Sequence, residues 1–469
     1  MGVVVVQIGQ GGNQMGYALF ECLASMAVSP PTEFFRSAQP HSAAVKARAV
    51  LVDMEPKVIQ GIVKRAKTAA VQAHRSAWTY DAQRLVAQNS GSGNNWARGY
   101  YGHGPQCLDS VLDAIRLEVE QCDVFGGFVI LQSLAGGTGA GLGAYLVEAL
   151  RDEYPSSFIL SHCIWPYESG EVIVQNYNVL LTLSHLQSFA DGVIIVQNEQ
   201  LSAICRTLLG VLRPSFDDIN EVAVEALGCA LLPSYWRTVQ PSTQTIQTDV
   251  VSCRPEIRRG GPSSTRPGVR LLSDLLSVLC SHPGYRMMTM RFTPQVPAQS
   301  LDFTNFTWAA QLKHLRQMLI TGAHKELEMD WNVKLPTSSV HEHKRGVFPT
   351  NGHHQINRSL ANLLILRGSG SDNADVSDFA DVRMYPIWQV DPLSVAACST
   401  SYGRYEIAAG LLSNCQSSVL PASRALTRAY NMFASKAFLH QYFEHGMEAA
   451  SFDGAFASIE DLVTRYSLL

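Results

Sequence analysis

Residues 134–143, Leu-Ala-Gly-Gly-Thr-Gly-Ala-Gly-Leu-Gly, combine backbone freedom with hydrogen-bond donors, which is a composition that suits the binding of an anion. An apolar run, 127–131, precedes them and an amphipathic run, 142–150, overlaps their end, so the pattern predicts a strand, a glycine loop and a helix. The loop and the helix start can donate N–H groups to phosphate oxygens. The alternative is a glycine turn that only packs the helix on the sheet.

This loop differs from the two common nucleotide loops. No Gly-Lys-Ser/Thr ends it, and it has more glycines than the dinucleotide fingerprint, with Thr138 among them. We therefore expect a third kind of nucleotide loop. A metabolic enzyme with a dinucleotide cofactor is the least favoured function class, because Thr138 and its glycines suit a triphosphate better.

Two further segments have the composition of phosphate loops. Residues 3–8 predict a buried strand, and 9–16, Gly-Gln-Gly-Gly-Asn-Gln-Met-Gly, lead into an apolar helix. Gln10 and Gln14 lie four residues apart, so on a helical turn both amides can face one ligand. Residues 89–96, Asn-Ser-Gly-Ser-Gly-Asn-Asn-Trp, form a polar turn that offers amides and side-chain oxygens.

Two carboxylates follow the strand-like run 50–53, namely Asp53 and Glu55. Carboxylates beside a phosphate site usually hold Mg²⁺, directly or through water. The alternative is a solvated turn that Pro56 ends.

The segment 135–141 matches the tubulin signature, which is a small residue, Gly-Gly-Thr-Gly, Ser or Ala, and Gly. The opening turn resembles the first loop of that family, with Gly11 where many members have cysteine or alanine. Other resemblances are to the sugar-binding loop (165–167 and 172–178), the guanine-reading segment (198–199), the start of the central helix (216–220) and the C-terminal helices (436–442 and 446–448). Within the superfamily, several runs look like the delta isotype: 49–58, 91–97, 171–177, 307–309, 312–320, 366–368 and 431–437.

The resemblance implies GTP or GDP with Mg²⁺ as ligands. Residues implied around the phosphates are Gln10, Gly11, Gln14, Ser92, Gly93, Asn94, Ser133, Ala135, Gly136, Gly137, Thr138, Gly139, Ala140 and Gly141. Asp53 and Glu55 would lie near Mg²⁺.

The base and the sugar are assigned by the same resemblance. Glu171 would accept hydrogen bonds from the ribose hydroxyls, since a carboxylate can accept from both. Asn198 and Asn220 would read the guanine edge, and Phe216 would stack on the ring where a tyrosine is frequent. Asn220 could instead, or also, cap the start of the central helix.

Hydrolysis in the family is shared across a head-to-tail contact, in which the next subunit inserts a loop whose acid positions the attacking water. Asp274 resembles the aspartate of that loop, and Ser277 stands where alpha-type subunits carry a catalytic glutamate. A serine cannot accept a proton as a carboxylate does at neutral pH. We therefore assign no catalytic residue, treat Asp274 as a possible remnant, and expect at most a slow GTPase.

Strand and helix patterns alternate through the first half of the chain, with expected strands at 3–8, 50–53, 128–132, 158–164 and 192–196. Such alternation predicts an α/β fold with a doubly wound, mostly parallel sheet and ligands at the carboxyl ends of its strands. The resemblance implies a tubulin-like GTPase domain, followed by a central helix, a second α+β domain and C-terminal helices. The expected division is a GTPase domain (1–214), the central helix (215–236), a flexible insert (237–267), an intermediate α/β domain (268–418) and a C-terminal helical region (419–469), with helices near 425–442 and 459–466.

Composition excludes several function classes. The chain has 36 Lys and Arg against 40 Asp and Glu in 469 residues, which gives no sign of nucleic-acid binding. No apolar stretch approaches the roughly 20 residues of a membrane span, and 3–6 lack the basic flank of a signal peptide. The ten cysteines include no Cys-x-x-Cys pair, as expected for reduced thiols in the core of a soluble intracellular protein.

Two polar stretches have open interpretations. The arginines of 237–268 could recruit an acidic partner, although a solvated loop is the simpler interpretation. His341, His343, His353 and His354 could chelate a metal, or could belong to an ordinary loop.

The favoured function is a structural GTP-binding protein that adds to, caps or templates microtubules through head-to-tail contacts with other tubulins. The delta resemblance implies centrioles, basal bodies and their triplet microtubules, hence a place in the cytoplasm, the cytoskeleton and the cilium or flagellum. The alternative is a nucleotide-gated adaptor that never polymerises. That alternative gains from Ser277, from the long insert, and from the lack of a glutamate-rich tail after Leu469.

Overall fold

The computed structural model describes residues 1–26, 29–38, 44–72, 78–170, 172–237, 272–304, 306–335 and 356–469. Glu171, the insert beyond Arg237 and the four histidines His341, His343, His353 and His354 lie outside these residues. Their assigned roles stay predictions.

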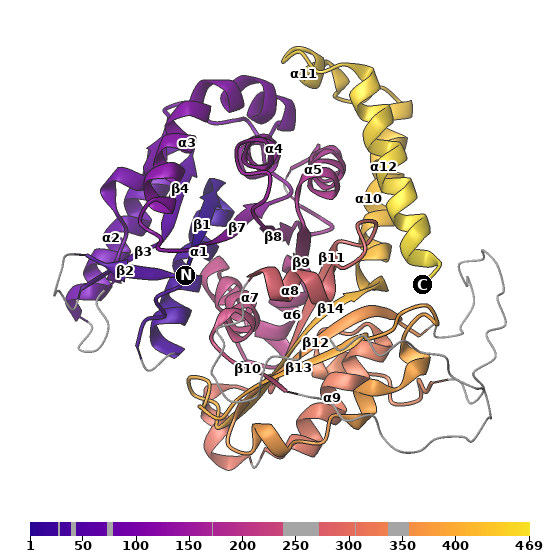
Figure 1. The fold of residues 1–469 in the computed structure, drawn as a ribbon. Helices are drawn as coiled ribbons and strands as arrows, with labels where there is room; N and C mark the ends of the chain where they lie inside the picture. Colours follow the sequence, from indigo (N-terminus) through magenta and orange to yellow (C-terminus); the bar gives the residue numbers. More distant parts are fainter. Residues whose placement is uncertain are drawn as a thin grey trace.

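One 11-stranded sheet runs through the molecule (Figure 1). From edge to edge its strands are β6 (Leu85–Ala87), β4 (Ala49–Asp53), β1 (Gly2–Ile8), β7 (Phe125–Ser133), β8 (Ile159–Trp165), β9 (Gly192–Gln197), β11 (Met287–Thr293), β14 (Ile407–Cys415), β12 (Ser359–Gly368), β13 (Leu393–Cys398) and β10 (Tyr235–Arg237). A small second sheet contains β2 (Phe35–Ser37), β3 (Val45–Ala47) and β5 (Trp78–Thr79).

The strands from β6 to β9 are parallel, and each of the five expected strands is present with ends within three residues of the prediction. Chain order runs outward from β1 to β4 and β6 on one side, and from β7 to β8 and β9 on the other. The winding therefore reverses between β1 and β7. In an open α/β sheet, the crevice at the carboxyl ends beside such a reversal is where ligands bind.

The sheet continues beyond these parallel strands. β11 pairs in parallel with β9 through Met287 opposite Val193, and it pairs antiparallel with β14. The strands of the expected second α+β region thus continue the sheet of the first half.

Helices cover both faces of the sheet. Val3 and Val5 of β1 join one core, whereas Val4 and Val6 join the other, as the two-residue repeat of a strand requires. The first core is covered by α1 (Gly9–Met26), α2 (Pro56–Gln72), α6 (Asn198–Thr207), α7 (Phe216–Leu231) and α8 (Leu272–Leu279). The second is covered by α3 (Gly104–Val119), α4 (Gly143–Glu153), α5 (Gln175–Phe189), α10 (Val419–Ala434) and α12 (Ala449–Ser467), with the short α11 (Leu439–Phe443) between the last two. A third core lies between α9 (Trp308–Thr321) and β12 to β14.

Two helix boundaries differ from the prediction. The central helix was expected over 215–236, but α7 ends at Leu231, because Leu232 is extended and the chain then enters β10. The helix expected over 425–442 is divided into α10 and α11. Lys436 and Phe438, between them, adopt positive φ angles of 56° and 60°, which an α-helix cannot contain.

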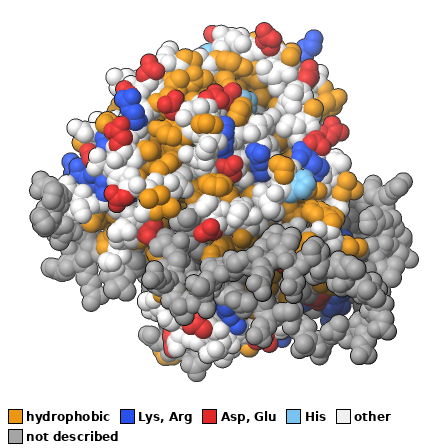
Figure 2. All heavy atoms as spheres, in the orientation of Figure 1, with side chains coloured by type: hydrophobic (Ala, Val, Ile, Leu, Met, Phe, Trp, Pro, Cys, Tyr) orange, Lys and Arg blue, Asp and Glu red, His pale blue; other side chains and the backbone are white. Residues whose placement is uncertain are grey.

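Acidic and basic side chains are interspersed over the face seen in Figure 2, with hydrophobic side chains exposed among them. Of the helices in the described ranges, none combines the length and the apolar composition needed to cross a membrane.

Candidate functional site

The loops singled out from the sequence meet at the carboxyl edge of the parallel strands. Gly9 follows β1, Asp53 ends β4, Ser133 ends β7 and Asn198 follows β9. The polar loop 89–96 leaves the same edge after β6. Since parallel strands bring their carboxyl ends together, residues more than a hundred positions apart are neighbours here.

The first loop touches the glycine loop through its backbone. Gly9 has a φ of +71°, and a Cβ at this position would lie 2.9 Å from the amide nitrogen of Gly139. A side chain would separate the two turns at the point where the winding reverses.

Much of the glycine loop is packed against the polar loop. A Cβ on Gly137 would lie 2.5 Å from Cβ of Ser92, and one on Gly141 would overlap the carbonyl oxygen of Trp96. The hydroxyls of Ser92 and Thr138 are 2.8 Å apart and share a hydrogen bond. The packing interpretation therefore explains Gly137 and Gly141.

Gly136 is different from these glycines. A Cβ there would meet only Oδ1 of Asn94, at 3.8 Å, so this position has open space beside it. Asn94 itself is exposed, as is Gly93, while Ala135 is partly exposed. The loop thus presents an accessible surface at 135–136, next to Asn94, which is where an anion could reach its backbone.

Asn178, on α5, joins the two loops. Its side-chain nitrogen donates to the carbonyl oxygens of Asn94 at 2.8 Å and Ala135 at 2.6 Å. Its side-chain oxygen accepts from the amide of Trp96 at 3.2 Å and from the hydroxyl of Tyr442 at 2.7 Å. The side chain is fully buried, and both its donors and its acceptor are used.

The start of α1 supplies the polar groups expected of it. Gln10 is exposed, and Gly11 and Gln14 are partly exposed. Asn13 is buried and donates to the carbonyl oxygens of Gly9 at 2.9 Å and Val52 at 3.0 Å, which fixes this turn to the end of β4.

Asp53 fits a cation site. Its Oδ1 accepts from the amides of Met54 and Glu55 at 2.8 and 3.4 Å, whereas its Oδ2 is buried with no hydrogen-bond partner among the described residues. Burial raises the pKa of this carboxyl to about 6, although the backbone amides oppose the shift. Glu55 is exposed, and a Cβ on Gly91 would lie 3.1 Å from its Oε1. A divalent cation would satisfy the buried oxygen, and the second carboxylate lies next to the polar loop.

The start of α7 is held beside α1. The Arg65 guanidinium lies 4.6 Å from the ring centre of Tyr17 and 3.1 Å from a carboxylate oxygen of Asp217. Phe216 is 57% exposed, and its ring is therefore free to stack on a ligand. Asn220 is buried one turn further on, but it does not cap the helix, since Ser215 and Asp218 form the capping box.

Sequence reasoning missed the two asparagines that hold the loops. Asn178 lies in the mostly apolar run 177–183 of α5, Tyr-Asn-Val-Leu-Leu-Thr-Leu, and Asn13 lies between Gly12 and Gln14. For Asn178 the signal was a polar residue within an apolar run, which a buried hydrogen-bond network explains, whereas the neighbours of Asn13 gave no such signal.

The other end of the sheet carries α8. A Cβ added to Gly127, near the start of β7, would lie 3.1 Å from the side chain of Leu272. A Cβ added to Gly192, at the start of β9, would lie 2.5 Å from the side chain of Leu276. Asp274 and Ser277 are thus at the amino edge, opposite the loops. The Ser277 hydroxyl is exposed and donates to the carbonyl oxygen of Asp274 at 3.0 Å.

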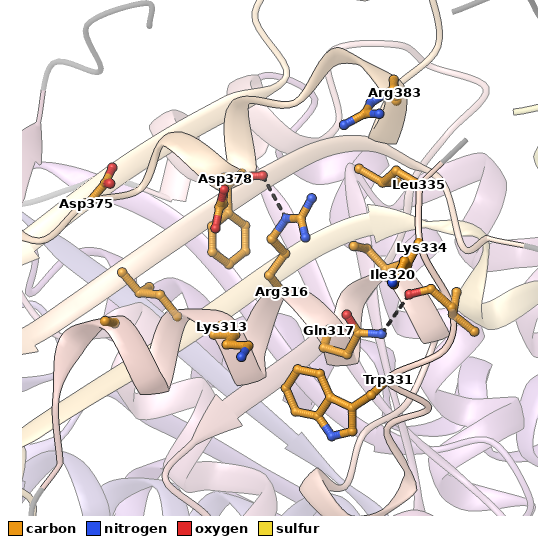
Figure 3. Close-up of a pocket in the computed structure, with 14 residues that line it drawn as sticks. Lys313, Arg316, Gln317, Ile320, Trp331, Lys334, Leu335, Asp375, Asp378 and Arg383 are labelled. Atoms are coloured by element: carbon orange, nitrogen blue, oxygen red, sulfur yellow. Dashed lines mark hydrogen bonds between the residues drawn. The ribbon is translucent and has the colours of Figure 1, made fainter. Parts of the chain in front are cut away.

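A separate hollow on α9 contains none of the predicted residues (Figure 3). Arg316 donates to the carbonyl oxygen of Asp378 at 2.9 Å, and Gln317 donates to that of Asp330 at 2.6 Å. Lys313 lies 5.2 Å from the ring centre of Trp331. We assign this hollow no part in the candidate site.

Comparisons with known proteins agree with this geometry. The GTPase domain of the Tubulin/FtsZ family matches residues 2–206. A tubulin delta chain of Macaca fascicularis is 39% identical over 483 residues, which cover 99% of each chain. One of Mus musculus is also 39% identical, over the whole of both chains, whereas the tubulin beta-3 chain of Zea mays is 26% identical over 99% of this chain and 94% of its own.

The doubly wound sheet has three glycine-rich or polar loops at its carboxyl edge. Together with these similarities, this arrangement defines the class of protein: the chain belongs to the tubulin family. Within it, the similarity to delta chains exceeds that to the beta chains compared. The matched GTPase domain implies GTP or GDP as the ligand.

We predict that Gly136→Ala leaves the fold intact and weakens nucleotide binding about tenfold or more. The added methyl has room in the free protein, yet it occupies the space through which phosphate oxygens would approach the backbone. The measurement is the dissociation constant of a fluorescent GDP, together with a thermal melt. Gly139→Ala is less informative, because its Cβ would lie 3.1 Å from backbone atoms of Ser133.

Gly61→Ala on α2 is the matched control, because a Cβ there meets nothing within 4 Å. It should leave nucleotide affinity unchanged. A well-folded Gly136→Ala protein with full affinity would move the phosphates away from this loop.

We predict that Asp53→Asn stabilises the nucleotide-free protein at pH 7.5 by about 1–3 kcal/mol. The pKa of Asp53 is raised on folding, so the folded state holds its proton more tightly than the unfolded chain does, and stability is lost as pH rises from about 4 through 6. Asparagine removes this loss, and the difference should shrink towards pH 4.5. Urea unfolding with and without Mg²⁺-GDP measures both effects, since only the wild type should gain from Mg²⁺. A variant less stable than the wild type at pH 7.5 without Mg²⁺ would contradict this prediction.

Proposed function

We propose that this protein is a GTP-binding tubulin that acts as a structural component or assembly factor of centriole and basal-body triplet microtubules in ciliated or flagellated cells. The observation that carries the proposal is the meeting of the predicted loops beside the reversal between β1 and β7. Similarity over the full chain to proteins named tubulin delta chain supports the cellular assignment.

Each part of the nucleotide has candidate partners. Gln10, Gln14 and the surface at 135–136 would bind the phosphates, and Asp53 with Glu55 would hold Mg²⁺, which neutralises phosphate charge when bound. Asn198 and Asn220 would read the guanine edge and Phe216 would stack on it. Glu171 remains the proposed ribose partner, and the domain division given above remains our proposal.

Head-to-tail contact with another tubulin is supported by the two opposite edges. Apolar side chains are exposed at the nucleotide edge, where Ile173 is 68% and Phe216 57% accessible. At the other edge, Trp388 is exposed. Its ring centre lies 6.1 Å from the ring centres of His282 and Tyr285, two residues in the turn that follows α8. Exposed apolar groups at both ends are what a longitudinal contact would bury.

The second candidate is a nucleotide-gated adaptor that does not polymerise. It is favoured by one observation at α8: Ser277, which stands where a glutamate was expected for catalysis, is exposed and its hydroxyl is bonded to its own helix. That group offers a neighbour's nucleotide no base.

The first experiment is to identify the nucleotide released from purified, denatured protein by ion-exchange chromatography, with the mass in solution measured by light scattering. GTP or GDP in near-stoichiometric amount supports the proposed site. Sedimentation with alpha/beta-tubulin and GTP then separates the two functions, since persistent monomer would favour the adaptor. An empty protein would overturn the nucleotide-bound form of the proposal.

We predict that Ser277→Glu raises GTP turnover about tenfold or more in any assembly where this subunit lies against a nucleotide-loaded neighbour. A carboxylate on this exposed helix face can accept the proton of the attacking water. Phosphate release is the measurement, and Ser277→Gln, of similar shape but without basicity, is the control. An equal rate for both variants in a demonstrated assembly would show that the missing acid does not limit turnover.

A further inference from the structure

A groove along α2 carries positive charge that the described structure does not neutralise. Its apolar floor is formed by Ile59, Val63 and Leu85, and Lys64 and Lys67 line its rim. The helix, residues 56–72, contains four basic residues and no acidic one. Arg65 is paired with Asp217, whereas neither rim lysine has an ion pair among the described residues.

The strand beside this groove has an open edge. β6 is the last strand of the sheet in the described structure, with β4 as its only neighbour. The amide of Gln88 donates to the carbonyl oxygen of Asp53 at 3.2 Å, so residues 86 and 88 turn their backbone groups towards β4. Leu85 and Ala87 therefore turn theirs outward, and Ala87 is exposed. An open strand edge is a template for a further strand.

We propose that α2 and β6 form a docking site for an extended acidic peptide of a partner protein, which pairs with β6 as an additional strand. Leu85 belongs to the core on the α2 side, and alternate side chains of an added strand would face that same side. Apolar residues at these positions would cover Ile59, Val63 and Leu85. Carboxylates at other positions on this same face of the peptide would meet Lys64 and Lys67.

Backbone pairing and the two lysines make separate contributions to this site. The paired backbone supplies affinity that is independent of sequence, and the groove selects the side chains. The lysines select against basic peptides, because like charges at a rim are unfavourable. The proposal does not depend on the identity of the nucleotide.

The probe is a fluorescein-labelled eight-residue peptide, Val-Thr-Glu-Thr-Val-Thr-Glu-Thr, whose valines and glutamates share one face of a strand. It is titrated into the full-length protein at low salt, and a control peptide has lysine in place of each glutamate. We expect saturable binding that weakens as salt is added, and slower hydrogen exchange at Leu85 and Ala87. No binding at millimolar peptide, equal binding of the control peptide with lysine in place of glutamate, or protection confined to other segments would overturn the proposal.

Two variants test the contacts separately. Ala87→Pro removes the outward amide without removing a bond to β4, because proline is tolerated on an edge strand whose N–H faces away from the sheet. Lys64→Glu with Lys67→Glu reverses the rim charge. Each should weaken the peptide about tenfold while nucleotide content and the thermal midpoint stay at wild-type values.

Lys57→Glu is the control, since this lysine is exposed on the same helix but does not line the groove. It should leave peptide affinity within about twofold of the wild type. Unchanged affinity in Ala87→Pro would exclude strand addition, and unchanged affinity in the lysine double variant would exclude recognition of acidic residues by the rim.

Discussion

The buried carboxamide of Asn178 holds the glycine loop and the polar loop together. Its side-chain nitrogen donates to carbonyl oxygens of two different loops. Its side-chain oxygen accepts from the polar loop and from Tyr442. A buried amide left without partners costs about 1–3 kcal/mol for each group, so the network is favourable only when every member is present. The separation of Asn94 from Ala135, and with it the open space beside Gly136, follows from this one side chain.

Glycines in the loop have two distinct roles that a sequence pattern does not separate. Gly137 and Gly141 are required because other backbone atoms occupy the space of their side chains. Gly136 has no such neighbour. Gly137 and Gly141 are required for packing. Gly136 is the position with open space through which a ligand could approach the backbone. The packing interpretation therefore holds at Gly137 and Gly141, and phosphate binding at Gly136 stays a proposal.

The sequence was sufficient for the parallel half of the fold, because its strands are buried on both faces and read as continuous apolar runs. It was also sufficient to bring Asp53, Ser92 and Ser133 to one edge, since strand order alone does so. It could not show that β11 continues the same sheet, because pairing between Met287 and Val193 leaves no local pattern. The break between α10 and α11 was missed for a similar reason, since neither Lys436 nor Phe438 is a residue type that predicts a left-handed turn.

The hydrogen bonds to the C-terminal region have a consequence for biosynthesis. Asn95 donates to the carbonyl oxygen of Gln441, a residue made 346 positions later, and Tyr442 closes the network of Asn178 from 264 positions away. A chain still on the ribosome has every glycine loop but lacks the last contacts that set their spacing. Loops of this kind, exposed beside unpaired strands, are prone to misassembly while they wait. The proposed nucleotide site is thus among the last parts of the molecule to form, because its loops lack these contacts until the C-terminal helices have been synthesised.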